Sequence, residues 1–235
     1  MKIEVLYGEI CNLFGDWQNA TYLRQTLPEA EIIETPLENT PCFVTDTPDL
    51  IYIGSMTEAN QRRAIKALQP HANRLKELIE NGTAVLATGN GGEILMKQID
   101  YVTEKIKTEG LGIVDLTVKT DLFDRFNGKV LGRFEDMDIV GFQSQFSTVS
   151  GDNTKSPFLK VERGVGCNRK GEYEGWRYKN LFVTSLLGPL LPLNPLFTEY
   201  LIRLAGEEKE AAFRPQAMAA YEQRLKEFKD PKTVF

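Results

Sequence analysis

The N-terminal part of the chain alternates short apolar runs with longer stretches of helical periodicity. Four of the apolar runs have the length of buried strands and lie at residues 2–7, 31–34, 49–54 and 83–87. A helical pattern covers residues 16–27, where Asp16 is placed to cap the first turn, and another covers residues 58–79 with a break at Pro70. Strands that alternate with helices in this way predict βαβ units and a parallel sheet.

The middle of the chain has a different pattern. A short helix is expected at residues 93–99, and strand-like runs then extend to about residue 187. Turn signals separate these runs at residues 127–128, 151–153 and 168–171. They predict antiparallel hairpins that continue the parallel sheet.

Helical periodicity returns at the C-terminal end, over residues 195–204 and 208–228. One face of the last helix is apolar and carries Met218, Tyr221, Leu225 and Phe228. Such a stripe packs either on the core or on a partner, and core packing is the favoured interpretation. We expect one domain, with residues 1–206 as its main body and residues 207–235 as a helical extension.

Composition narrows the functional classes. A net charge of −5 opposes nucleic-acid binding. The longest apolar run, at residues 181–197, is broken by prolines and is too short to span a membrane. Glu4 interrupts any apolar core of a signal peptide, and the odd number of cysteines, without CxxC spacing, fits a reducing compartment. A cytoplasmic location is therefore expected.

The most informative local feature is a glycine-rich turn, since residues 88–92 read TGNGG directly after a predicted buried strand. Glycines at a strand-to-helix turn are typical of a nucleophile elbow, in which a strained central residue projects above the sheet beside amides that bind an oxyanion. Here the central residue is Asn90. A phosphate-binding turn fits less well, because Ile94 stands where the third glycine of GxGxxG belongs. A plain structural turn is the remaining interpretation.

Three further segments give this turn a context. Residues 12–24 read NLFGDWQNATYLR, residues 49–55 read DLIYIGS, and residues 174–195 read EGWRYKNLFVTSLLGPLLPLNP. With GNGGEIL at residues 89–95, these ordered segments resemble the CobB/CobQ-like class I glutamine amidotransferases, in particular the GatD-type glutaminase subunits of lipid II isoglutaminyl synthase. The resemblance implies a three-layer, flavodoxin-like α/β fold. Its sheet should be mostly parallel with antiparallel strands added, followed by C-terminal helices.

The resemblance also implies that the catalytic residues are substituted. The family's nucleophilic cysteine falls on Asn90, its catalytic histidine on Leu187, and the glutamine after the elbow on Ile94. An asparagine amide is not a nucleophile at neutral pH, and leucine cannot accept the proton that imidazole would carry. The single histidine, His71, is expected on a flanking helix, away from the elbow.

Other parts of the family's site have counterparts. The resemblance places oxyanion-binding amides at Gly54 or Ser55 and at Gly91, and polar wall residues at Gln143 and Gln145. Arg125 aligns with an arginine beside the family's active site, and a plain surface charge is the alternative. Cys167 is a candidate nucleophile, although a partly buried thiol is the favoured interpretation. No metal ligand spacing and no Walker motif occur, so no cofactor is expected.

Three functional hypotheses remain open. The first is a catalytically degenerate glutaminase homologue that binds a small amide or amino acid and serves a Mur-ligase-like or other ATP-dependent synthetase. The second is an active amidotransferase-type hydrolase that uses Cys167 or Ser55 as its nucleophile. The third is a passive subunit whose cleft is filled by Asn90, Leu187 and Ile94.

Overall fold

The computed structural model describes residues 1–169 and 171–235. Its main sheet has six strands in the order β13-β14-β4-β3-β1-β2. They are β1 (Lys2–Leu6), β2 (Glu31–Thr35), β3 (Leu50–Ile53), β4 (Ala84–Thr88), β13 (Trp176–Tyr178) and β14 (Leu181–Thr184). All neighbours pair in parallel except β13, which is antiparallel to β14. The predicted parallel sheet is confirmed.

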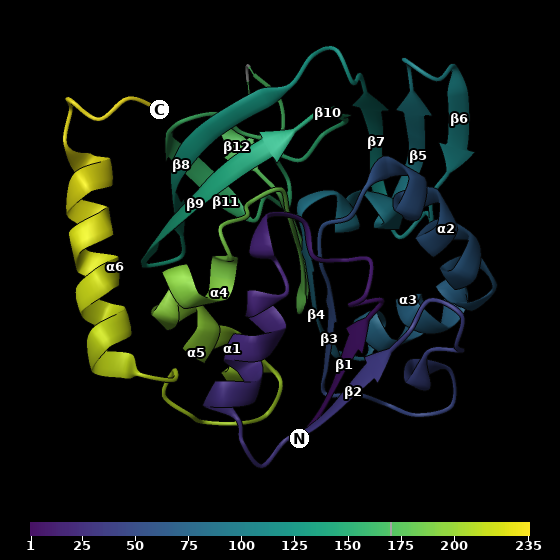
Figure 1. Cartoon of the computed structure of the whole chain (residues 1–235), viewed down its shortest axis with the longest axis horizontal. Coiled ribbons are helices and arrows are strands. Elements are labelled where there is room, and N and C mark those ends of the chain that lie inside the picture. The colour runs from purple at the N-terminus through teal and green to yellow at the C-terminus, as the bar shows by residue number, and fades with distance from the viewer. Residues whose placement is uncertain (170) are drawn as a thin grey trace.

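Helices cover both faces of this sheet and give three layers (Figure 1). One face holds α2 (Glu58–Leu68) and α3 (Ala72–Glu80), joined by the 3-10 turn η3 (Gln69–His71) at the predicted proline break. The other face holds α1 (Gln18–Thr26), α4 (Leu190–Leu193) and α5 (Pro195–Leu204). Successive side chains of a strand point to opposite faces of the sheet, so each strand can contribute to both cores. In β3, Ile51 and Ile53 join the α2–α3 core, whereas Leu50 and Tyr52 join the α1–α5 core.

The strands of the middle region form two separate four-stranded sheets. One has the order β10-β7-β5-β6, with β5 (Met96–Tyr101), β6 (Ile106–Glu109), β7 (Val114–Thr120) and β10 (Ser147–Ser150). The other has the order β12-β11-β8-β9, with β8 (Phe126–Phe134), β9 (Met137–Gln145), β11 (Leu159–Arg163) and β12 (Tyr173–Glu174). The prediction that antiparallel hairpins continue the main sheet is therefore confirmed only for β13 and β14, and it is wrong for the other strands of this region.

Several local predictions for this region also need correction. The helix expected at residues 93–99 is a single 3-10 turn, η5 (Glu93–Leu95), because β5 begins at Met96 and pairs with β6 and β7. The turn expected at residues 127–128 lies inside β8, and the β8–β9 hairpin instead turns at Glu135, which has a positive φ of 52°. Residues 151–153 follow β10 and carry no regular structure. The turn expected at residues 168–171 includes residue 170, which lies outside the described residues.

The last helix, α6 (Arg214–Lys229), begins later than residue 208 because Phe213 takes a left-handed conformation and a proline occupies the first turn. Its side chains Tyr221 and Phe228 are buried against Leu131 and Val140. The apolar stripe thus packs within the chain, as predicted, while the domain boundary at residue 206 remains a prediction.

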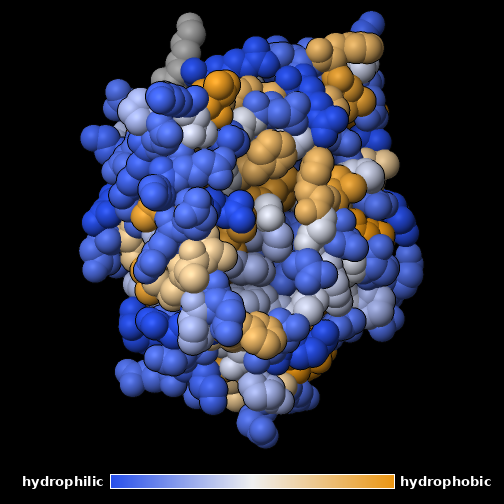
Figure 2. Space-filling model, turned by 60° about the vertical axis from the view of Figure 1, so that its left-hand side comes forward, coloured by the Kyte–Doolittle hydropathy of each residue, from blue (hydrophilic) through white to orange (hydrophobic). Residues whose placement is uncertain are grey.

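The molecular surface agrees with the charged composition. The face in Figure 2 is mostly hydrophilic, and its apolar side chains gather in small patches. In the part of the chain that the structure describes, no helix combines the length and apolarity needed to cross a bilayer.

Candidate functional site

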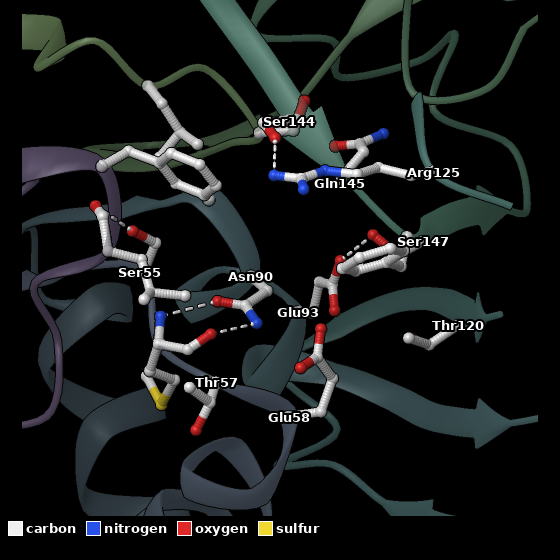
Figure 3. A pocket seen from close by; sticks show the side chains of 17 residues that line it. Ser55, Thr57, Glu58, Asn90, Glu93, Thr120, Arg125, Ser144, Gln145 and Ser147 are labelled. Carbon is white, nitrogen blue, oxygen red and sulfur yellow. Dashed lines mark hydrogen bonds between the residues drawn. The ribbon is translucent and has the colours of Figure 1, made fainter. Parts of the chain in front are cut away.

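A cleft of about 260 Å³ lies where the carboxyl ends of the central parallel strands meet the two smaller sheets (Figure 3). Ser55 and Met56 line it after β3, Gly89 and Asn90 after β4, and Leu187 after β14. The opposite wall comes from β7 to β10. Open α/β sheets place ligands at the carboxyl ends of their strands, so this is the position where a site is expected.

The turn after β4 is built on two glycines. Gly89 has a φ of +55°, and η4 (Gly89–Gly91) begins there. A Cβ on Gly91 would lie 2.3 Å from the carbonyl oxygen of Gly54, so only glycine permits this approach of the β3 and β4 loops. Asn90 is not among the residues with positive φ. The left-handed backbone conformation therefore falls on Gly89, which adopts it without strain, and the strain expected at the central residue of an elbow is absent from Asn90.

The side chain of Asn90 is held by the backbone of a single neighbour. Its Oδ1 accepts a hydrogen bond from the amide of Met56 at 2.9 Å, and its Nδ2 donates to the carbonyl of Met56 at 2.7 Å. The carbonyl oxygen of Asn90 accepts from Nε2 of Gln61 at 2.8 Å. The carboxamide thus closes a two-point clamp between the β4 turn and the β3 loop.

Of the amides predicted to bind an oxyanion, that of Ser55 is engaged inside the protein, where it donates to Oδ2 of Asp16 at 2.8 Å. Gly54 and Gly91 do not line the cleft. Gly91 is buried against the Gly54 carbonyl. The cleft therefore differs from a preorganised oxyanion hole, whose amides point at the ligand.

Asp16 has a different role from the predicted helix cap. The N-cap of α1 is Trp17, without a side-chain capping bond, and Asp16 is fully buried. Its carboxylate accepts hydrogen bonds from the Ser55 amide, from the Thr88 hydroxyl at 2.6 Å and from Asn19 Nδ2 at 2.8 Å. Burial raises its pKa, which these hydrogen bonds oppose. Asp16 ties the ends of β3 and β4 to the start of α1.

No imidazole reaches the cleft. Leu187 forms an isolated bridge with Phe142, and the two residues exchange backbone hydrogen bonds of 2.8 and 3.1 Å. The ring of His71, the chain's only histidine, lies in η3 and packs edge-on against Phe43 at 6.5 Å. Ile94 is buried in the α2–α3 core and does not line the cleft. The cleft is open, so the filled cleft of the third hypothesis is contradicted.

Neither of the two candidate nucleophiles is paired with an imidazole. Cys167 is 6% exposed and lies on a smaller neighbouring cavity, where its sulfur accepts from the Gly175 amide at 3.1 Å. Burial raises the pKa of Cys167 to about 12, which keeps the thiol protonated at neutral pH. The hydroxyl of Ser55 donates to the carbonyl of Leu13 at 3.0 Å, and the Ser55 side chain also contacts the buried carboxylate of Asp16, with no imidazole within reach among the described residues.

Arg125 lines the cleft at the start of β8. Its Nη2 donates to the Ser144 hydroxyl at 2.8 Å, and its guanidinium lies 5.2 Å from the ring centroid of Phe146. It forms no ion pair with a carboxylate within the described residues. Gln145 also lines the cleft, whereas Gln143 is fully buried behind the wall and donates to the Ser185 hydroxyl at 2.8 Å.

Glu93 is a cleft residue that the sequence did not single out. Its carboxyl group accepts from the Ser147 hydroxyl in a short hydrogen bond and from Gln61 Nε2 at 2.8 Å (Figure 3). Gln61 is oriented in turn by the Tyr101 hydroxyl, which donates to its Oε1 at 2.7 Å. Glu93 is 6% exposed, and burial raises its pKa to about 7. Its position beside the glycine turn was a signal, but its partners come from distant elements.

Within residues 1–169 and 171–235 no group of three or more histidine, cysteine or acidic side chains could hold a metal ion.

Comparisons with known proteins agree with this architecture. Residues 2–194 match the model of the CobB/CobQ-like glutamine amidotransferase domain. The chain is 33% identical over 212 residues to the lipid II isoglutaminyl synthase (glutamine-hydrolyzing) subunit GatD of Staphylococcus aureus (strain N315), covering 87% of this chain and 84% of that protein. It is 25% identical over 213 residues to the GatD subunit of Streptococcus pneumoniae (strain ATCC BAA-255 / R6), covering 89% and 82%.

A solved structure described as a glutamine amidotransferase superposes with a TM-score of 0.52 at 17% identity, over 87% of this chain and 99% of that one. At this identity the likeness concerns the fold alone. Family match, relatives and fold point the same way, and the chain belongs to the CobB/CobQ-like glutamine amidotransferase family.

Proposed function

We propose that this chain is a non-hydrolytic member of its family, which binds a small amide or amino acid in the cleft and acts as the partner of a synthetase. The observation that carries the proposal is the Asn90 clamp. The nitrogen lone pair of a carboxamide is delocalised into the carbonyl group, so Asn90 is not a nucleophile, and both ends of its carboxamide are fixed on the backbone of Met56. Neither Leu187 nor any other cleft side chain supplies an imidazole to move the proton.

The ligand part of the proposal rests on the polar lining that remains. The Arg125 guanidinium lines the cleft and forms no ion pair in the described part of the chain, and a guanidinium fork suits a carboxylate. The cleft of about 260 Å³ lies below the range of about 300–1,000 Å³ common for drug-sized ligands. A small metabolite of amino-acid size fits these features.

The partner part of the proposal rests on the relatives, both of which are named as subunits of a synthase. By analogy, this chain would act in the cytoplasm beside a Mur-ligase-like or other ATP-dependent synthetase. Copurification of a tagged chain from its own cells, followed by identification of the retained proteins, tests this part. Retention of no ATP-dependent ligase would contradict it.

Glutamine hydrolysis is the decisive assay. Ammonia release is measured with the purified chain alone and with any retained synthetase, for wild type, Asn90→Ala and the matched control Asn39→Ala. Asn39 is exposed, and its side chain makes no hydrogen bond in the described part of the chain. We expect no release above background in any sample. Ammonia release that Asn90→Ala abolishes and Asn39→Ala preserves would overturn the proposal.

A thiol-reactive glutamine analogue tests the rival nucleophile. The raised pKa of Cys167 predicts no labelling of the native protein at neutral pH. Selective labelling of Cys167, with loss of an ammonia-releasing activity in Cys167→Ser, would instead support an active hydrolase.

A further inference from the structure

We infer that Glu93 and Thr120 form a specificity subsite that takes the ammonium group of a zwitterionic ligand, while Arg125 takes its acidic group. This inference rests on the proposed function, because it assumes that the cleft binds without hydrolysing. It adds the residues that select the ammonium group of that ligand.

The first argument is the unused hydrogen-bonding capacity of Glu93. One carboxyl oxygen accepts from Ser147 and the other from Gln61. A carboxylate offers about four lone-pair sites, so about two remain for a donor in the cleft. An ammonium group supplies up to three donors and a charge of the opposite sign.

The second argument is an unsatisfied hydroxyl beside Glu93. Thr120 lines the cleft and is 3% exposed, and its Oγ1 has no hydrogen-bond partner among the described residues. Thr120 pairs with Ser147 across β7 and β10, so it adjoins the residue that holds Glu93. Buried hydroxyls are nearly always hydrogen-bonded, so the missing partner of Thr120 Oγ1 shows that the polar groups at this end of the cleft are incompletely satisfied by the protein.

The third argument is the separation of charges in the cleft. Figure 3 shows the Arg125 guanidinium above the opening and the carboxyl groups of Glu93 and Glu58 below it. None of the three forms an ion pair within the described residues, although the molecule has many surface ion pairs. A cleft with a cation at one side and carboxylates at the other is complementary to a zwitterion.

Binding should depend on pH through Glu93. An ammonium favours the ionised carboxylate, so below pH 7 the ligand must displace a proton and its affinity falls. The charged and titratable groups around Glu93 are Glu58 on α2, Tyr101 on β5 with Arg62 stacked on its ring, Arg125 across the cleft, and Cys167 and Glu174 on the adjoining cavity. Glu58 raises the pKa of Glu93, whereas a bound cation lowers it.

Calorimetric titration tests the inference with defined probes: glutamine and glutamate, their N-acetyl derivatives, and the amines that result from removing the α-carboxylate. We expect a free amino acid to bind with a Kd that weakens roughly tenfold from pH 8 to pH 6, as one proton is displaced. The N-acetyl derivative lacks the ammonium group and should bind more weakly because it loses the contact with Glu93. The amine lacks the α-carboxylate and should bind more weakly because it loses the contact with Arg125.

Variants assign the effect to the subsite. Glu93→Gln should weaken binding at pH 8 and abolish the pH dependence, Thr120→Val should weaken it with the pH dependence retained, and Arg125→Met should weaken it at both pH values. Glu109→Gln, an exposed glutamate on β6, is the matched control and should change nothing.

Two results would overturn the inference: no binding by any probe, or the same Kd and pH profile in Glu93→Gln as in wild type. Melting curves of each variant show whether it folds. If Glu93→Gln does not fold, the binding of the N-acetyl probe to wild type and the binding of the free amino acid to Arg125→Met still test the inference. Ammonia release from glutamine would refute the proposed function without touching the subsite, because the Kd effects of Glu93→Gln are measured separately.

Discussion

The clamp between Asn90 and Met56 makes a quantitative prediction. Asn90→Ala removes one hydrogen bond of 2.9 Å and one of 2.7 Å, and it leaves a partly buried amide and carbonyl of Met56 without partners. The net contribution of a neutral hydrogen bond is about 1 kcal/mol, so the expected loss in free energy of unfolding is about 2 kcal/mol. For a domain of this size each kcal/mol lowers Tm by about 2–4 °C, which predicts a decrease of about 4–8 °C.

A second substitution tests the geometry of the same clamp. Asn90→Asp keeps an acceptor for the Met56 amide but replaces the donor nitrogen with an oxygen that faces the Met56 carbonyl. It should therefore destabilise at least as much as Asn90→Ala above pH 5. Urea denaturation followed by circular dichroism measures both variants against Asn39→Ala. A loss below about 0.5 kcal/mol for Asn90→Ala, or an Asn90→Asp variant as stable as wild type, would refute the clamp.

Three further predictions concern groups around the cleft. Asp16→Ala should cost about 3 kcal/mol or more in urea denaturation, since a buried carboxylate with three donors is lost; a cost below 1 kcal/mol would contradict this. The raised pKa of Glu93 stabilises the folded state fully below pH 4.5, and this contribution is lost as pH rises through about 7. Relative to wild type, Glu93→Gln should therefore gain up to about 3 kcal/mol between pH 5 and pH 8 in parallel denaturation curves, and an unchanged difference would be inconsistent with a raised pKa. Cys167 should react with Ellman's reagent at pH 7.5 only after unfolding, and rapid reaction of the native protein would show that the thiol is accessible.

The parts of the fold that sequence periodicity captured are those with strong local signals. The strand over Leu50–Ile53 is wholly apolar, and the α5 helix has a proline at its start and apolar residues throughout. Both were located within one residue. Met96–Tyr101 buries Met96, Ile99 and Tyr101, which is not a regular alternation, and its position directly after a glycine turn suggested a helix. Pairing with β6 on one side and β7 on the other decided its conformation, because hydrogen bonds to two neighbouring strands outweigh a weak local preference.

The residues of the candidate site were likewise predicted only in part. Asn90, Ser55 and Arg125 were picked out by their motifs, and the structure brings all three to one cleft. Cys167 lies on a neighbouring cavity, and Gln143 lies behind the wall. Their motifs gave no information about which side of a strand or loop would face the cleft, since one residue of register reverses that choice.

The amino-acid sequence by itself determined which side chains are available: it has asparagine at residue 90, leucine at residue 187 and a single histidine, His71. The tertiary structure alone decided which groups surround the glycine turn. The Asn90 clamp joins residues 34 apart in the chain, and the hydrogen bond between Ser147 and Glu93 joins residues 54 apart. Such contacts, and the desolvation that raises the pKa of Glu93, arise from how layers pack, which no local pattern encodes.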